Sequence, residues 1–162
     1  MRKSFSILAA IGVALITGCA SSRQFVPLPN QSTRVEDPSK GRIYVMRPAS
    51  GFWETAAMNI SQDGKFIGRT GPRGFICWER LPGATIITGK AEGISQVPLT
   101  IEPGGVYFIF EHVRMGFLMA RNELEVLDEQ QGREILKRCH AAKIAPAPPS
   151  GFSVSREPEP SR

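Results

Sequence analysis

The fold is decided by residues 96–113, which read Gln96-Val97-Pro98-Leu99-Thr100-Ile101-Glu102-Pro103-Gly104-Gly105-Val106-Tyr107-Phe108-Ile109-Phe110-Glu111-His112-Val113. Apolar and polar residues alternate in the first seven positions, which is the period of a strand with one buried side. Pro98 lacks an N–H, so this strand is expected at a sheet edge. The Pro-Gly-Gly sequence favours a turn, and the residues after it are rich in β-branched and aromatic types. We therefore expect two consecutive strands.

Similar signals extend to both sides of this stretch. Further candidate strands lie at 42–46, 75–78, 85–88 and 123–127. Asp63-Gly64 separates residues 58–62 from 65–68 and predicts a hairpin, because a primed turn needs residues that accept positive φ. Turn sequences recur at intervals of about ten residues. The chain is therefore expected to be mainly β, an antiparallel β-sandwich of about seven to eight strands.

One helix is expected after the last strand. Asp128 can cap its N-terminus, with Gln131 as the reciprocal partner. Gly132, Ile135, Leu136 and Cys139 follow at helical spacing and form a narrow apolar face. The pattern predicts a C-terminal α-helix packed on the sandwich.

The N-terminus carries export features. Arg2 and Lys3 precede an apolar run that is too short to cross a bilayer. The run ends in Ile16-Thr17-Gly18-Cys19, which resembles the signal of bacterial lipoproteins. An ordinary cleaved signal or an uncleaved helical anchor are the alternatives.

The lipoprotein resemblance implies a location. Residues 1–18 would be the signal peptide, removed before Cys19, and Cys19 would carry a diacylglycerol and an N-terminal acyl chain such as palmitate. Ala20 in place of Asp implies the outer membrane, facing the periplasm. Two or more acyl chains hold a protein stably on a membrane.

Composition divides the rest of the chain. Residues 19–40 are rich in Ser, Pro and Asn and are expected to form the lipidated N-terminus and a flexible tether of about 25 Å. Residues 41–142 would form the β-sandwich domain with its helix. Residues 143–162 are rich in proline and would be a disordered tail.

Two further cysteines remain, Cys77 and Cys139. Export would place them in an oxidising compartment, so they are a candidate disulfide that would join the helix to the sandwich. Two free thiols are the alternative, because the sequence does not give the separation of the Cα atoms.

Charge and motifs exclude several classes of function. The formal net charge of +5 loses the charges of Arg2 and Lys3 with the signal peptide, which argues against a nucleic-acid partner. No metal site is predicted, because the adjacent Cys139 and His140 diverge on a helix. No cofactor motif and no catalytic motif occurs, so an enzyme is not expected.

Two apolar loop segments are the candidate binding surface. The first segment contains Phe52 and Trp53, and the second contains Phe117 and Met119. Arg114 would lie at the rim of this surface. Aromatic and Met side chains in loops are typical of binding hot spots. The alternative is that both segments close the end of the sandwich as part of its core.

The order of these elements resembles a known family. The segments that carry the resemblance are Gly41–Pro48, Asp63–Gly68, Leu81–Gly83, Pro103–Phe108, Met115–Phe117 and Leu124–Leu127. They are similar to the small bacterial lipoproteins grouped as domain of unknown function 2846, over about residues 40–135. The resemblance implies a fold and a location, and no catalytic or binding residues.

The sequence is therefore consistent with two hypotheses of function. The first is a lipid-anchored, non-enzymatic binding or assembly module of the cell envelope that faces the periplasm. Its partners would be the membrane, through the N-terminal lipid, and an envelope protein or glycan. The second is a small-molecule-binding or hydrolytic lipoprotein with a site between sheet and helix.

Overall fold

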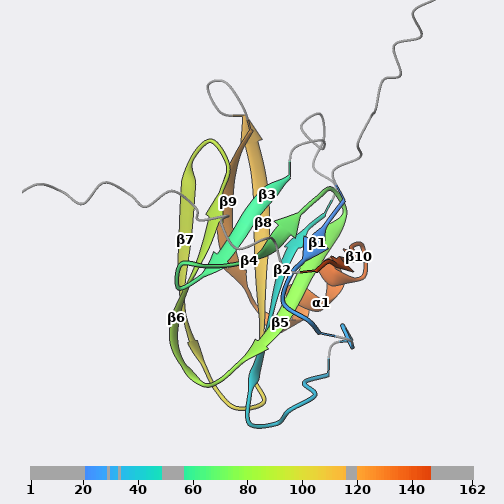
Figure 1. Cartoon of the computed structure of the whole chain (residues 1–162), viewed down its shortest axis with the longest axis vertical. Helices are drawn as coiled ribbons and strands as arrows, with labels where there is room; N and C mark the ends of the chain where they lie inside the picture. Colours follow the sequence, from blue (N-terminus) through green and yellow to red (C-terminus); the bar gives the residue numbers. More distant parts are fainter. Residues whose placement is uncertain (1–20, 29, 33, 49–56, 116–119, 147–162) are drawn as a thin grey trace, which may run out of the picture.

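A computed structural model describes residues 21–28, 30–32, 34–48, 57–115 and 120–146, which form two β-sheets and one helix (Figure 1). The six-stranded sheet has the order β11 (Lys143–Ile144), β1 (Arg23–Gln24), β4 (Lys65–Thr70), β3 (Met58–Gln62), β6 (Gly83–Lys90), β7 (Ile94–Ile101). The five-stranded sheet has the order β10 (His140–Ala141), β5 (Gly74–Arg80), β2 (Gly41–Arg47), β8 (Val106–Met115), β9 (Ala120–Leu127). The helix α1 spans Glu129–Leu136. No helix in the described part is long and apolar enough to span a bilayer.

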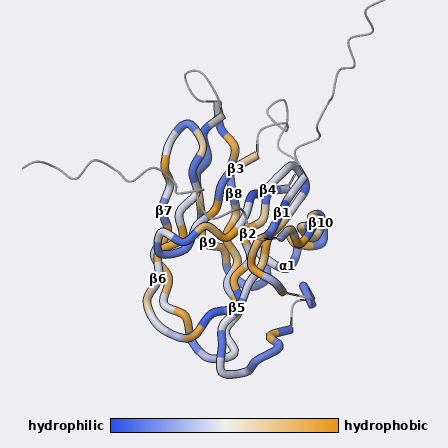
Figure 2. The backbone as a smooth tube through the Cα atoms, viewed as in Figure 1, coloured by the Kyte–Doolittle hydropathy of each residue, from blue (hydrophilic) through white to orange (hydrophobic). Residues whose placement is uncertain are grey.

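The main core lies between the two sheets. Ile43 and Val45 of β2 face this core together with Ile60 of β3 and Ile87 of β6, and all four are 0% exposed. Figure 2 shows hydrophobic positions along the strands and hydrophilic ones in the turns between them. Each fully buried aliphatic side chain contributes about 1.5–3 kcal/mol.

A second core lies on the outer side of the five-stranded sheet. Tyr44 and Phe108 stack with ring centroids 5.3 Å apart, and Ile135 and Leu136 of α1 pack against their cluster. The helix therefore covers part of this outer face, and β2 is buried on both of its sides.

The prediction of a mainly β chain with a C-terminal helix is confirmed. The antiparallel arrangement and the strand number are wrong, because the described residues form eleven strands in two mixed sheets. β2 and β8 are parallel neighbours, joined by a connection that passes through both sheets. Alternation of side chains predicts a strand but not its direction, and β1, β10 and β11 have only two residues each.

Two local predictions are confirmed. Asp63 and Gly64 join β3 to β4 with φ of 49° and 78°, which a primed hairpin turn requires. Asp128 caps α1, since its side chain accepts a 2.8 Å hydrogen bond from the Gln131 N–H.

The described part of the predicted tether is built into the domain, and this corrects its description as flexible. Arg23–Gln24 pairs with β4 and β11, and Leu28 is 5% exposed. Further on, Arg42 and Tyr44 both donate hydrogen bonds to the Ser32 carbonyl. Strand β11 likewise extends the domain into the predicted tail. Such short pairings leave no periodicity in the sequence, so Ser- and Pro-rich composition was a misleading signal here.

Candidate functional site

An open groove of about 480 Å³ lies between α1 and the uncovered part of the five-stranded sheet. Its floor is formed by Phe110 and His112 of β8 and by Glu125 and Leu127 of β9. Its wall is the side of α1 that carries Gln130, Gln131, Glu134 and Ile135.

Strand alternation places the floor residues. Ile109 and Glu111 face the space between the sheets, so Phe110 and His112, at the alternate positions of β8, face outward. The ring centroids of these two residues lie 4.2 Å apart. On the neighbouring strand, Glu125 places its Oε2 atom 2.6 Å from Nε2 of His112.

The groove combines a histidine–carboxylate pair with apolar surface. His112 and Glu125 have the arrangement of a base and its orienting carboxylate, and the described residues of the lining include no Ser, Thr, Cys or Lys beside them. The side chain of Glu125 is 56% exposed, so water screens the pair. Apolar surface from Phe110, Leu127 and Ile135 lies beside these polar groups, as in typical ligand sites.

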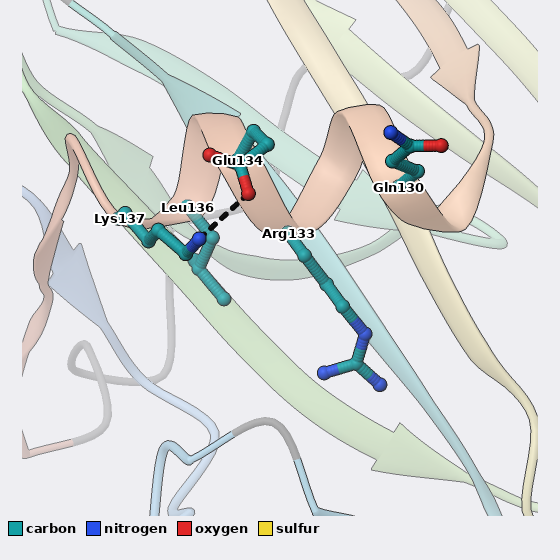
Figure 3. A pocket seen from close by; sticks show the side chains of 5 residues that line it. All are labelled: Gln130, Arg133, Glu134, Leu136 and Lys137. Carbon is teal, nitrogen blue, oxygen red and sulfur yellow. Dashed lines mark hydrogen bonds and ion pairs between the residues drawn. The ribbon is translucent and has the colours of Figure 1, made fainter.

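A second hollow, of about 370 Å³, lies along α1 next to the groove and is lined by Gln130, Arg133, Glu134, Leu136 and Lys137. Figure 3 shows Arg133 extending away from the ion pair between Glu134 and Lys137, whose Oε1 and Nζ atoms are 2.6 Å apart. The Arg133 guanidinium lies 6.0 Å from the centre of the Phe108 ring, a cation–π distance. Gln130 and Glu134 border both hollows, so a ligand lying across α1 would meet them from either side.

A buried polar cluster lies deeper, between the sheets. Glu111 of β8 is 1% exposed and accepts hydrogen bonds from the Thr70 hydroxyl and from Nδ2 of Asn122, the latter 3.3 Å long. Burial raises the pKa of the Glu111 carboxyl, while the Thr70 hydrogen bond and the charge of Arg47 act in the opposite direction. A ligand in the groove does not reach this carboxyl, so the cluster is structural.

The predicted site residues are placed as follows. Arg114 lies on β8, with its side chain 65% exposed and its Nε atom 2.5 Å from Oε2 of Glu123. The other candidates for the binding surface (Phe52, Trp53, Phe117 and Met119) and the lipidation candidate Cys19 lie outside the described residues. The described strands β2 and β8 are parallel neighbours, so their C-terminal ends lie at the same edge of the sheet.

The disulfide predicted between Cys77 and Cys139 is not formed in the structure, where both residues are free thiols. Both belong to the cluster between α1 and the sheet, as expected for Cys139. Burial raises the pKa of the Cys77 thiol to about 12 and that of Cys139 to about 11, which makes both poor nucleophiles. A shared cluster is not sufficient for a disulfide, which requires a narrow range of Cα separation.

This groove lies where the second of the two expected functions has its site, between sheet and helix. The residues that line it (Phe110, His112, Glu125 and Leu127 on the strands) are not predicted by the sequence as one surface with α1. The available signal was α1 itself, whose apolar stripe is too narrow to cover all of the outward residues of β8 and β9.

The comparisons with known proteins give one distant relative. A protein of Haemophilus influenzae described only as uncharacterized is 26% identical over 147 residues, which is 88% of this chain and 87% of the relative. No family model matches the chain. No solved structure matches it either.

Proposed function

We propose that this chain is a lipid-anchored protein of the bacterial cell envelope, held by Cys19 in the outer membrane and facing the periplasm. The export features before Cys19 and the resemblance to small lipoproteins support this location. Its activity is binding, and the groove between α1 and β8–β9 is the binding site.

The observation that carries the binding activity is the composition of the groove. Phe110, Leu127 and Ile135 offer apolar surface, and the lining carries two carboxylates, Glu125 beside the imidazole of His112 and Glu134, which also pairs with Lys137. An apolar side chain beside a Lys or Arg complements this surface in both shape and charge. The carboxamides of Gln130 and Gln131 have donors and acceptors for a peptide backbone. The ligand is therefore an extended segment of an envelope protein with an apolar residue next to a basic one.

Photo-crosslinking in living cells tests the site. A photoreactive residue at position 130 lines the groove, and one at position 65 is the matched control, because Lys65, the first residue of β4, is exposed and belongs to the other sheet. We expect position 130 to capture a peptide of one envelope protein that contains the apolar–basic sequence, and position 65 not to capture it.

The double variant Glu125→Gln, Glu134→Gln separates charge recognition from proximity. It should reduce the yield of the crosslinked peptide several-fold while leaving the unfolding transition of the protein in place. Identical products from positions 130 and 65, or a yield that does not respond to the double variant, would show that the groove does not bind such a segment.

A further inference from the structure

A row of cations crosses the six-stranded sheet beside its N-terminal strand. Arg23 of β1 lies directly opposite Arg69 of β4 on one side and Lys143 of β11 on the other. The row continues through Asn59 of β3 to Lys90 of β6. The strands β1, β4, β3 and β6 lie side by side in Figure 1.

These side chains share the outer face of the sheet. Gln24 is 0% exposed and faces the core, so Arg23, the residue before it, faces outward and is exposed. Residues directly opposite each other on neighbouring strands lie on the same face, which places Arg69 and Lys143 there too. The helix α1 packs on the other sheet and leaves this face uncovered.

The arrangement costs stability unless an anion compensates it. Like charges directly opposite each other destabilise a sheet. In the described part of the chain, no carboxylate forms an ion pair with Arg23, Arg69 or Lys143. A lysine on an edge strand protects against aggregation, which explains Lys143 on β11. It does not explain Arg23 and Arg69, since β1 and β4 are interior strands.

Aromatic and aliphatic side chains accompany the cations. Phe25 and Phe66 are half-buried with ring centroids 5.3 Å apart, and Phe66 lies opposite Ser61 on the outward register of β3. Ile86 and Ile94, on the outward register of β6 and β7, are 46% and 56% exposed. Cations interleaved with aromatic and aliphatic residues are characteristic of surfaces that rest on lipid headgroups.

The position of strand β1 indicates which partner contacts this face of the sheet. Ser22 accepts a 2.9 Å hydrogen bond from the Gly71 N–H and so fixes the beginning of β1 on the domain. Cys19 precedes Ser22 by three residues, a span of at most about 11 Å. An anchor at Cys19 therefore holds the cationic row within reach of the bilayer surface, in place of the longer tether expected from composition.

We infer that the outer face of the six-stranded sheet around Arg23, Arg69 and Lys143 is a contact surface for the anionic phospholipid headgroups of the bilayer that holds Cys19. This inference rests on the proposed lipid anchor. The contact orients the domain with one sheet toward the membrane and the groove, on the opposite sheet, toward the periplasm.

Lysine footprinting on vesicles tests the contact with the mature, lipidated protein. The protein is reconstituted in vesicles of phosphatidylcholine alone or with phosphatidylglycerol and treated with an amine-acylating reagent that does not cross membranes. We expect the acylation rate of Lys143 to fall about fivefold in the phosphatidylglycerol vesicles, while Lys65 reacts equally in both. High salt should restore the reactivity of Lys143 without releasing the protein, because salt screens the headgroup charge and not the lipid anchor.

The outcomes distinguish this inference from the proposed anchor. A protein that carries no lipid and does not remain with the vesicles refutes the anchor. A protein that remains anchored refutes the contact if Lys143 reacts equally in both vesicles, or if its protection is shared by Lys65. The variant Arg23→Gln should halve or abolish the protection of Lys143 while the protein stays anchored; full protection in that variant also refutes the contact.

Discussion

Glu111 depends for its chemistry on the side of β8 that it occupies. The alternation in residues 106–113 predicts that Glu111 shares a face with Ile109, and that His112 shares the other with Phe110, and the structure confirms both. The sequence could not show which face meets a second sheet, because both carry apolar residues. That choice makes Glu111 a buried acid and leaves His112 in the groove.

The buried carboxyl predicts a pH-dependent stability. Its pKa in the folded protein lies above the ordinary value of 4.5, so between these values the folded state binds more protons than the unfolded state. Its contribution is therefore fully present below pH 4.5 and is lost as the pH rises through the folded pKa. In Glu111→Gln this loss disappears, so the variant should gain stability relative to the native protein from about pH 5 to pH 8.

Chemical denaturation across that pH range measures the effect. Glu102→Gln, which removes the charge of an exposed carboxyl after β7, is the control. A difference between Glu111→Gln and the native protein that stays constant with pH would mean that the carboxyl does not titrate differently in the folded state.

The helix α1 is the element that the sequence predicts best. Its cap, its apolar stripe and its contact with the sheet follow from Asp128 and the spacing of the residues after it. The sequence placed Gly132 on the apolar face without a reason for a glycine there. The structure supplies the reason, since a Cβ at this position would lie within 2.6 Å of Cδ2 of Phe108.

Gly132→Ala is therefore expected to destabilise the protein, although alanine is the better helix former by about 1 kcal/mol. The Phe108 ring is 1% exposed and packed on Tyr44, so it has little room to move, and overpacking costs about 1–3 kcal/mol. Gln130→Ala, at an exposed position of the same helix, should be neutral or slightly stabilising. The thermal unfolding temperatures of both variants test this prediction. A Gly132→Ala variant that unfolds at a higher temperature than the native protein would mean that α1 does not pack closely on β8.

Strand β1 is the element that the sequence missed. Gln24 is fully buried, with Oε1 accepting a 2.9 Å hydrogen bond from the Cys77 N–H and Nε2 donating to the Val26 carbonyl. Gln24→Ala leaves the Cys77 amide without its partner, and we expect a loss of about 1–3 kcal/mol in unfolding free energy. Arg23→Ala, at the exposed neighbour, should cost far less. If Gln24→Ala and the native protein are equally stable in urea denaturation, β1 is not part of the folded domain and the segment is a flexible tether.

At the scale of the whole molecule, the two sheets have different outer faces. One carries α1 and the groove, and the other carries the cationic row, so the molecule has two opposite working surfaces. Residue types and strand periodicity predict the strands of both sheets, but not their order, because parallel neighbours such as β2 and β8 are far apart in the chain. Both surfaces depend on that order, which is why the sequence suggests a site between sheet and helix but not the residues of either surface.

The central claim is that the domain is anchored through Cys19, directly before its first strand. Mass spectrometry of the protein extracted from bacterial membranes tests it, with N-terminal peptide identification and the mass of the intact chain. We predict a chain that begins at Cys19 and carries a diacylglycerol and an N-terminal acyl chain, and a Cys19→Ser variant that keeps its signal peptide and gains no lipid. A mature chain that begins at any other residue, or one without lipid, would contradict the account.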